Sequence, residues 1–147
     1  MVYSNLSDPF GHRRHGNSPV MQVARKAIPR DLGWVKVMAD AHRKEIGFVL
    51  LPSLVEAQAH GELLVLNGGG GFCRYHQRRD GWHTIYEIVS TVGGGGRALL
   101  EAVGRPLRLK CPVGLPANGF YAHMGGTLAR VEDGRKRALN VWEWPAL

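Results

Sequence analysis

The stretch that decides the fold is Ser90-Thr91-Val92-Gly93-Gly94-Gly95-Gly96-Arg97-Ala98-Leu99-Leu100, with four consecutive glycines. It follows Thr84-Ile85-Tyr86-Glu87-Ile88-Val89, a run typical of a β-strand, and it leads into residues that favour a helix. The first turn of a helix has backbone N–H groups without partners and a partial positive charge. A loop without side chains lets a phosphate reach those groups. The sequence therefore predicts a strand, a glycine loop and a helix that together hold a pyrophosphate.

The composition is that of one globular domain. The chain has 147 residues, of which 44% are hydrophobic, enough to bury a core of ordinary size. Its longest apolar stretch, residues 46–51, is too short to span a bilayer, and its polar start lacks the apolar segment of a signal peptide. We expect no membrane association and a cytoplasmic protein, with residues 21–147 as the single domain. Residues 1–20, which contain His12-Arg13-Arg14-His15 among many Gly, Ser, Asn and Pro residues, are expected to be a disordered basic tail.

The formal charge of +7 is consistent with an anionic ligand, and it leaves nucleic-acid binding open. Cys73 and Cys111 are too few for a disulfide framework, so we expect reduced thiols packed in strands. The histidines are scattered singly without metal-ligand spacing, so we expect no metal cofactor.

Hydrophobic periodicity and turn residues predict a mixed sheet flanked by helices, an α/β fold. The expected strands are 34–38, 62–66, 72–78, 83–89, 107–111, 128–132 and 138–144, and the expected helices are 41–48, 52–60, 97–103 and 117–124. Asp80-Gly81 is a strong hairpin signal, so the strand that follows it should be antiparallel to its predecessor. A second four-glycine run, residues 68–71, is expected to be a flexible turn between strands that binds nothing.

The order of elements and three segments resemble the GNAT superfamily of acyl-CoA-dependent N-acyltransferases, over roughly residues 22–144. The segments are residues 89–100, Leu107-Arg108-Leu109-Lys110-Cys111, and Ala117-Asn118-Gly119-Phe120-Tyr121-Ala122-His123-Met124-Gly125-Gly126. The chain departs from the family in three ways: Thr91 stands where a Gln or Arg is usual, Gly126 stands where an aromatic residue is usual, and the loop before the glycines is shorter. The resemblance implies a mostly antiparallel central sheet in which strands 83–89 and 107–111 splay apart to form the acyl-CoA cleft.

The resemblance also implies where the cosubstrate, acetyl-CoA or another acyl-CoA, would bind. Its pyrophosphate would lie over Gly93, Gly94, Gly95, Gly96 and Arg97, and its pantetheine arm beside Ile88, Val89 and Ser90. Backbone N–H groups near Val89 would stabilise the oxyanion. Asn118 would either bond the arm, as its family counterpart does, or cap the helix that starts there.

The implied reaction is direct attack of an amine on the thioester. Tyr121 matches the family's tyrosine, whose hydroxyl protonates or hydrogen-bonds the departing sulfur. Glu87 lies two positions before Val89, so both should point to one face of the strand and Tyr86 to the other. We interpret Glu87 as either the proton acceptor or one half of a structural ion pair.

The amine acceptor cannot be read from the sequence, because this superfamily acylates many amines through variable loops. The alternative function is a catalytically degenerate domain that binds nucleic acid through its basic surface. A third hypothesis takes a nucleobase or a nucleic-acid-associated protein as the acceptor. The resemblance also leaves a homodimer open, since family members commonly pair edge strands or helices.

Overall fold

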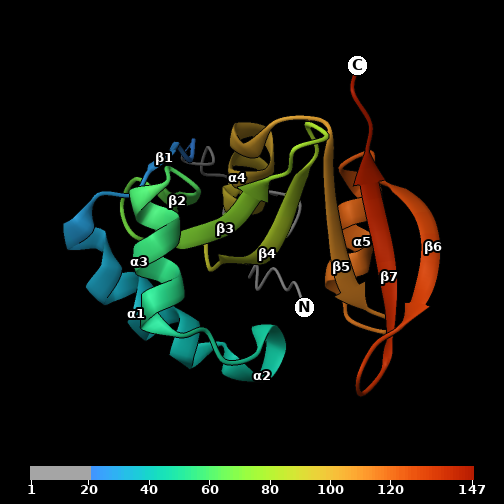
Figure 1. Cartoon of the computed structure of the whole chain (residues 1–147), viewed down its shortest axis with the longest axis horizontal. Helices are drawn as coiled ribbons and strands as arrows, with labels where there is room; N and C mark the ends of the chain where they lie inside the picture. Colours follow the sequence, from blue (N-terminus) through green and yellow to red (C-terminus); the bar gives the residue numbers. More distant parts are fainter. Residues whose placement is uncertain (1–20) are drawn as a thin grey trace, which may run out of the picture.

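The computed structural model describes residues 21–147, so the tail expected at residues 1–20 lies outside the described residues. The described elements form one seven-stranded sheet in the order β1-β2-β3-β4-β5-β7-β6 (Figure 1). The helices are α1 (Leu32–Ala41), α2 (Arg43–Ile46), α3 (Leu51–Ala59), α4 (Gly95–Val103) and α5 (Ala117–His123), with a 3-10 turn at Pro29–Asp31. The strands are β1 (Ala24–Lys26), β2 (Leu63–Leu66), β3 (Gly71–Gln77), β4 (His83–Ser90), β5 (Leu107–Pro112), β6 (Thr127–Asp133) and β7 (Ala138–Trp144). All neighbouring strands are antiparallel except β4 and β5, which are parallel. The predicted mixed, mostly antiparallel sheet is confirmed.

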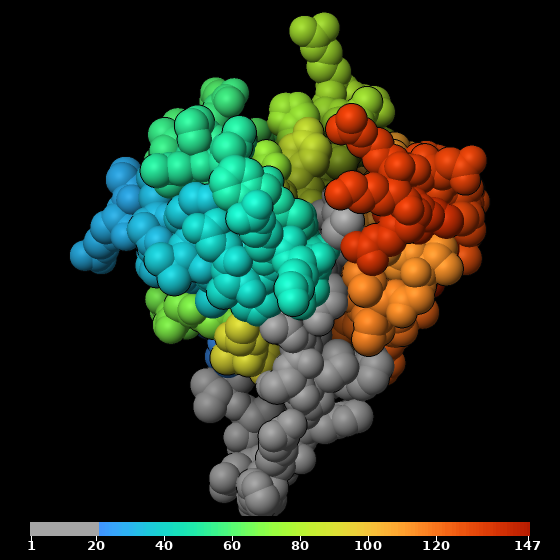
Figure 2. Space-filling model, turned by 90° about the horizontal axis from the view of Figure 1, so that it is seen from below, coloured from blue at the N-terminus to red at the C-terminus, as the bar shows by residue number. Residues whose placement is uncertain are grey.

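The sheet separates two hydrophobic clusters. On one face, which we call the α1–α3 face, Val35 and Leu54 of the helices pack against Phe72 and Val89 of the strands. On the other face, the α4–α5 face, residues of α4 and α5 pack against inward-facing residues of β4, β5 and β7. Seen from below, α1 to α3 and the segment from β5 to β7 make up opposite sides of the molecule (Figure 2). Consecutive residues of β4, such as Ile88 and Val89, therefore pack into different hydrophobic clusters on the two faces of the sheet.

The strand predicted at 34–38 is wrong, because these residues lie in α1. Val35 and Ala39 are its buried positions, four residues apart, which is the spacing of one helix face. Val37 is exposed, so the apparent alternation did not mark a buried strand face. The first strand is instead β1, which has only three residues and which the pattern did not predict. The helix expected at 41–48 is reduced to the short α2.

The remaining predicted elements are confirmed within two residues of their ends. The turn at Asp80-Gly81 joins β3 and β4 as an antiparallel hairpin. Cys73 and Cys111 are free thiols buried in β3 and β5, also as predicted. No helix among residues 21–147 is long and apolar enough to cross a membrane.

The earlier glycine run lies against the residues that directly precede the later one. Residues 67–70 join β2 to β3, so the glycine run forms a connection between strands as predicted, and its last residue, Gly71, is the β-ladder partner of Ser90. The Thr91 N–H and hydroxyl both donate to the Gly70 carbonyl, at 2.8 and 3.0 Å. A Cβ on Gly71 would lie 2.4 Å from the Val89 carbonyl oxygen, so a side chain cannot fit there. The earlier run thus packs closely against the end of β4 and the two residues that follow it.

Candidate functional site

The site begins where β4 and β5 separate. They pair only at their first three residues, His83 to Ile85 with Leu107 to Leu109. Beyond that point β4 continues to Ser90 and β5 to Pro112 without pairing to each other, and Figure 1 shows the strands diverging. The predicted splayed pair is confirmed.

Hydrogen-bond alternation identifies which backbone groups face this gap. The Thr91 N–H bonds to Gly70 across the ladder with β3, so Val89, two residues earlier, also directs its backbone groups to β3. Ile88 and Ser90 then direct theirs away from β3, toward the gap. Of the three residues predicted to bind the pantetheine arm, Ile88 and Ser90 are fully buried, and their backbone groups have no partner strand on the side of the gap. The Val89 backbone is paired with Phe72 and does not face the gap, so a part for Val89 in binding the cosubstrate stays a prediction that this pairing does not support.

On the other side of the gap, Asn118 completes the edge of β5. Its amide nitrogen donates to the carbonyls of Pro112 and Leu115, both at 2.9 Å. Its oxygen accepts from the Asn140 amide at 3.0 Å and the Trp142 indole at 2.8 Å. All four bonds that an Asn amide can make are used, so the predicted bond to the pantetheine arm would have to replace one of them. The alternative, a helix cap, is wrong, because α5 has Pro116 at its N-cap position, while the bond to the pantetheine arm stays a prediction. Asn118 instead ties β5, α5 and β7 together.

Gly94 and Gly95 of the glycine loop have different structural surroundings. Gly94 occupies the N-cap position of α4 with φ 79°, and a Cβ there would meet nothing within 4 Å. A Cβ on Gly95 would lie 2.2 Å from Ser90 Oγ, so Gly95 is needed for close packing of the helix on β4. The Gly95 N–H already bonds to the Val92 carbonyl at 3.2 Å, so this group has a partner in the protein and the predicted contact of Gly95 with a phosphate stays a prediction.

Four backbone N–H groups of the predicted cradle remain available. Among residues 21–147, no hydrogen bond takes the N–H groups of Gly93, Gly94, Gly96 or Arg97. Gly93 and Gly94 are partly exposed, Arg97 is exposed and Gly96 is buried. The side-chain-poor opening of α4 thus has unpaired donors and the positive end of the helix dipole, as an anion site requires.

Glu87 forms a buried ion pair. Its side chain is 5% exposed and accepts from Arg74 Nη2 at 2.6 Å and from Arg74 Nε at 3.0 and 3.2 Å. Burial raises the pKa of Glu87, and the Arg74 guanidinium opposes that shift. Of the two interpretations of Glu87, the ion pair is therefore present, and the role of proton acceptor stays a prediction.

A β-bulge changes the direction of Tyr86. The register of the β3–β4 ladder shifts between Arg74 and Tyr75, which pair with Glu87 and Ile85 and leave Tyr86 as the extra residue. The Arg74 guanidinium lies 4.7 Å from the centre of the Tyr86 ring while it also bonds Glu87. The prediction that Tyr86 and Glu87 point to opposite faces is wrong, because the bulge interrupts the two-residue alternation.

Tyr121 lies on the opposite face of the sheet from Glu87. It is fully buried in the α4–α5 cluster together with Ile88 and Cys111. The Trp144 ring packs edge-on against it, with ring centres 6.1 Å apart. A Cβ on Gly126 would lie 2.7 Å from that indole, so Trp144 takes the space that a larger residue at 126 would need. The two predicted catalytic residues can therefore act on one substrate only through the gap between β4 and β5.

Sequence reasoning missed Arg74 and Pro112, although both left signals. Counting outward from the Asp80-Gly81 turn along the observed register brings residue 74 opposite residue 86, and the bulge moves it by one residue to Glu87, so the turn signal places a cation within one residue of that carboxylate. Pro112 lacks an N–H and favours an unpaired strand edge, which is the situation of β5 beside the gap. Among residues 21–147 there is no group of three or more His, Cys, Asp or Glu residues able to hold a metal ion.

No protein-family model matches the chain, and no curated protein does so. Solved structures do match it. Ard1 from Thermoplasma volcanium superposes with a TM-score of 0.74 at 16% identity, covering 87% of this chain and 99% of its own. A GNAT-family acetyltransferase from Bacillus cereus gives a TM-score of 0.67 at 12% identity, with coverage of 87% and 99%. Ribosomal-protein-alanine N-acetyltransferase from Brucella melitensis gives 0.63 at 17% identity, with coverage of 84% and 99%. Together with the splayed strands and the glycine-opened helix, these likenesses show that the chain has the fold of the GNAT superfamily of acetyltransferases.

Proposed function

We propose that this protein is an N-acyltransferase that moves an acyl group, most simply acetyl, from acyl-CoA to an amine. The observation that carries the proposal is the set of N–H groups at Gly93, Gly94, Gly96 and Arg97, which have no acceptor among the described residues. They lie at the opening of α4, next to the end of β4. A diphosphate is the kind of ligand that such a group of donors binds.

The residues present fit an acyl-CoA. The four amides would hold its pyrophosphate, and the backbone groups of Ile88 and Ser90 at the gap would bond its pantetheine arm as an additional strand would. The cosubstrate supplies the activated acyl group as a thioester. The backbone N–H groups at the gap would stabilise negative charge on the acyl oxygen during transfer.

The positions of Glu87 and Tyr121 support direct transfer between two bound substrates. Glu87 on the α1–α3 face would accept the proton of the attacking amine, directly or through water. Tyr121 on the α4–α5 face would donate a proton to the departing sulfur. The amine would thus approach from one face of the sheet while the sulfur departs toward the other.

The nucleic-acid alternative is supported only by the net charge of +7. A domain that bound nucleic acid through surface charge alone would need neither the splayed strands nor the unpaired amides. The acyltransferase proposal accounts for both features.

The first test is binding of acetyl-CoA. We expect coenzyme A to be retained in native mass spectra of the purified protein, and acetyl-CoA to raise its melting temperature. Gly94→Glu should abolish this stabilisation, because its carboxylate would lie close to the bound diphosphate, where like charges about 4 Å apart repel by about 4 kcal/mol.

Gly94→Ala is the matched control. A Cβ at this position meets nothing within 4 Å, so alanine brings only the strain of its left-handed backbone, about 1–2 kcal/mol, and no charge. It should therefore melt lower but still respond to acetyl-CoA. If native protein shows no response at millimolar acetyl-CoA, or if the glutamate variant responds as strongly as the alanine variant, the proposed function is wrong.

A further inference from the structure

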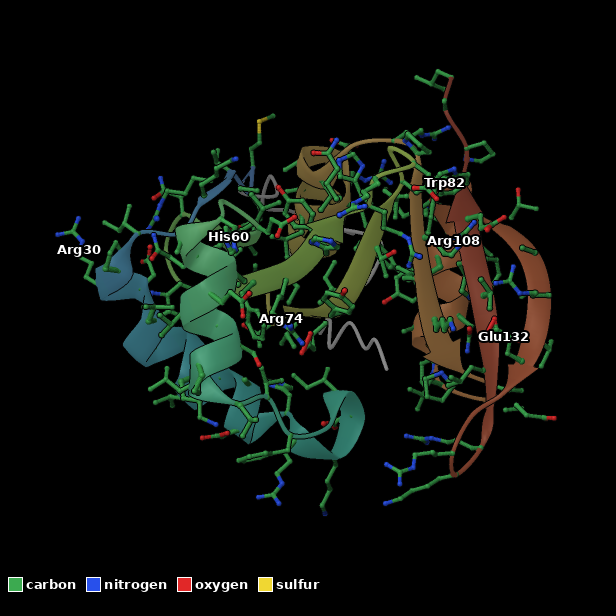
Figure 3. All side chains as sticks on the ribbon, in the orientation of Figure 1. Arg30, His60, Arg74, Trp82, Arg108 and Glu132 are labelled. Atoms are coloured by element: carbon green, nitrogen blue, oxygen red, sulfur yellow. The ribbon has the colours of Figure 1, made fainter. Side chains whose placement is uncertain are left out.

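A concave site lies on the α1–α3 face, next to the candidate base. This α3 hollow, as we call it, lies between helix α3 and strands β3 and β4 and has a volume of about 560 Å³. Its lining residues are Ser53, Glu56, Ala57, His60, Glu62, Arg74, Tyr75, His76 and Tyr86. Figure 3 shows Arg74 and His60 among the side chains of this region. The volume lies within the range of small-molecule sites.

With its lining residues His60 and His76 counted as neutral, as in the formal charge of the chain, the hollow has the opposite charge from the protein as a whole. Although the chain carries a formal +7, the hollow contains the carboxylates of Glu56 and Glu62. Arg74 is the only arginine or lysine among its described lining residues, and Glu87 already neutralises it. Burial alone would raise the pKa of Glu62, but the Gln77 N–H and His76 hold it below its ordinary value. The hollow therefore favours a cation.

An aromatic ring adds to this preference. Tyr86 is 40% exposed and forms part of the hollow, and its ring already packs against the Arg74 guanidinium. Carboxylates combined with a tyrosine ring are the surroundings in which an ammonium group binds well.

The hollow also adjoins the candidate base. Arg74 bonds Glu87, and Tyr86 precedes Glu87 in the chain, so two lining residues of the hollow contact or neighbour that carboxylate. An acceptor whose reacting amine lies at Glu87 can therefore extend into the hollow.

We propose that the α3 hollow binds a second, non-reacting ammonium group of the acceptor. The acceptor is then an amine with two cationic groups, either a free aliphatic diamine or a peptide with a lysine beside its reacting amine. This inference rests on the acyltransferase function proposed above, and it specifies the acceptor of that reaction.

The experiment compares 1,5-diaminopentane with 1-aminopentane in calorimetry at pH 8. Native protein should bind the diamine about tenfold more tightly, a difference that two partly exposed ion pairs can supply. Glu56→Gln should reduce that preference, and Glu56→Gln combined with Glu62→Gln should remove it. The control is Glu101→Gln, which makes the same charge change at an exposed position of α4 on the opposite face, and it should keep the full preference.

Turnover with acetyl-CoA distinguishes the two possible acceptors, a free diamine and a lysine-containing peptide. If the acceptor is a free diamine, it should be acetylated with a higher kcat/KM than a lysine-containing dipeptide, and the reverse order identifies a peptide acceptor. Either order supports the hollow if Glu56→Gln lowers kcat/KM for the doubly cationic acceptor and spares the monoamine. Equal binding of the two pentylamines, or a Glu56→Gln variant with unchanged preference, would overturn the inference and leave the proposed function intact. Diamine binding in a protein that does not bind acetyl-CoA would refute the acyltransferase function and, with it, the acceptor role of the hollow.

Discussion

Replacing Arg74 with methionine should destabilise the protein strongly at pH 8 and weakly at pH 5. Arg74 is the described partner of Glu87, with a shortest N–O distance of 2.6 Å, and Glu87 is 5% exposed. Methionine would leave the carboxylate buried without its cation, a change that costs about 3–5 kcal/mol for a fully buried pair. The Arg74 side chain is 22% exposed, so we expect the lower end, about 3 kcal/mol at pH 8.

The pH dependence follows from the direction of the pKa shift. Burial raises the pKa of Glu87 while Arg74 opposes the shift, so removing Arg74 raises this pKa further. A carboxyl with a higher pKa in the folded protein binds its proton there first, and stability falls as the pH rises from the ordinary glutamate range through the raised value. At pH 5 the variant can protonate Glu87, which removes most of the cost.

Thermal unfolding followed by circular dichroism measures this effect. A loss of about 3 kcal/mol corresponds to a melting temperature lower by about 6–12 °C for a chain of this size. Glu87→Gln combined with Arg74→Met should recover much of the loss, because no buried charge remains. Equal destabilisation of Arg74→Met at pH 5 and pH 8 would refute this reasoning, since a loss of packing alone does not depend on pH.

Three further outcomes are expected. Gly95→Ala should lower the free energy of unfolding by about 1–3 kcal/mol, measured by chemical denaturation, because its Cβ would lie 2.2 Å from Ser90 Oγ and 2.6 Å from a Leu66 methyl group. An unchanged free energy of unfolding would contradict the close approach of α4 to β4. Tyr121→Phe should lower kcat about 100-fold in steady-state assays while the Kd for acetyl-CoA stays constant, as loss of a general acid predicts; an equal loss of affinity would point to a packing role. Asn118→Ala should lower the free energy of unfolding by about 2–4 kcal/mol, because it removes four hydrogen bonds at about 1 kcal/mol or less each. A loss of acetyl-CoA affinity at constant stability would instead support the predicted bond between Asn118 and the pantetheine arm.

Patterns local in sequence accounted for much of the fold. The hairpin signal at Asp80-Gly81, the strand–glycine–helix order around residue 94 and the alternation along β7 depend on neighbouring residues alone, and all three are present in the structure. The failure at residues 34–38 has a local cause as well, since five residues can satisfy a two-residue and a helical period at once. Burial of Val35 beside Leu54 and Phe72 decides between the two periods, and that contact joins residues far apart in the chain.

The sequence by itself determined that a side-chain-poor loop opens a helix, since only glycine tolerates both the positive φ of Gly94 and the close approach at Gly95. The tertiary structure decided which groups face which side. The bulge at Tyr86 turned that ring to the face of Arg74 and Glu87, and the separation of β4 from β5 left the backbone of Ile88 and Ser90 without a partner strand on that side. Asn118 has a structural role because β5, α5 and β7 meet around its side-chain amide, which hydrogen-bonds to groups of these elements. The physical reason is that hydrogen bonds and ion pairs are made with whatever the folded chain brings within about 3 Å, and sequence spacing does not specify those neighbours.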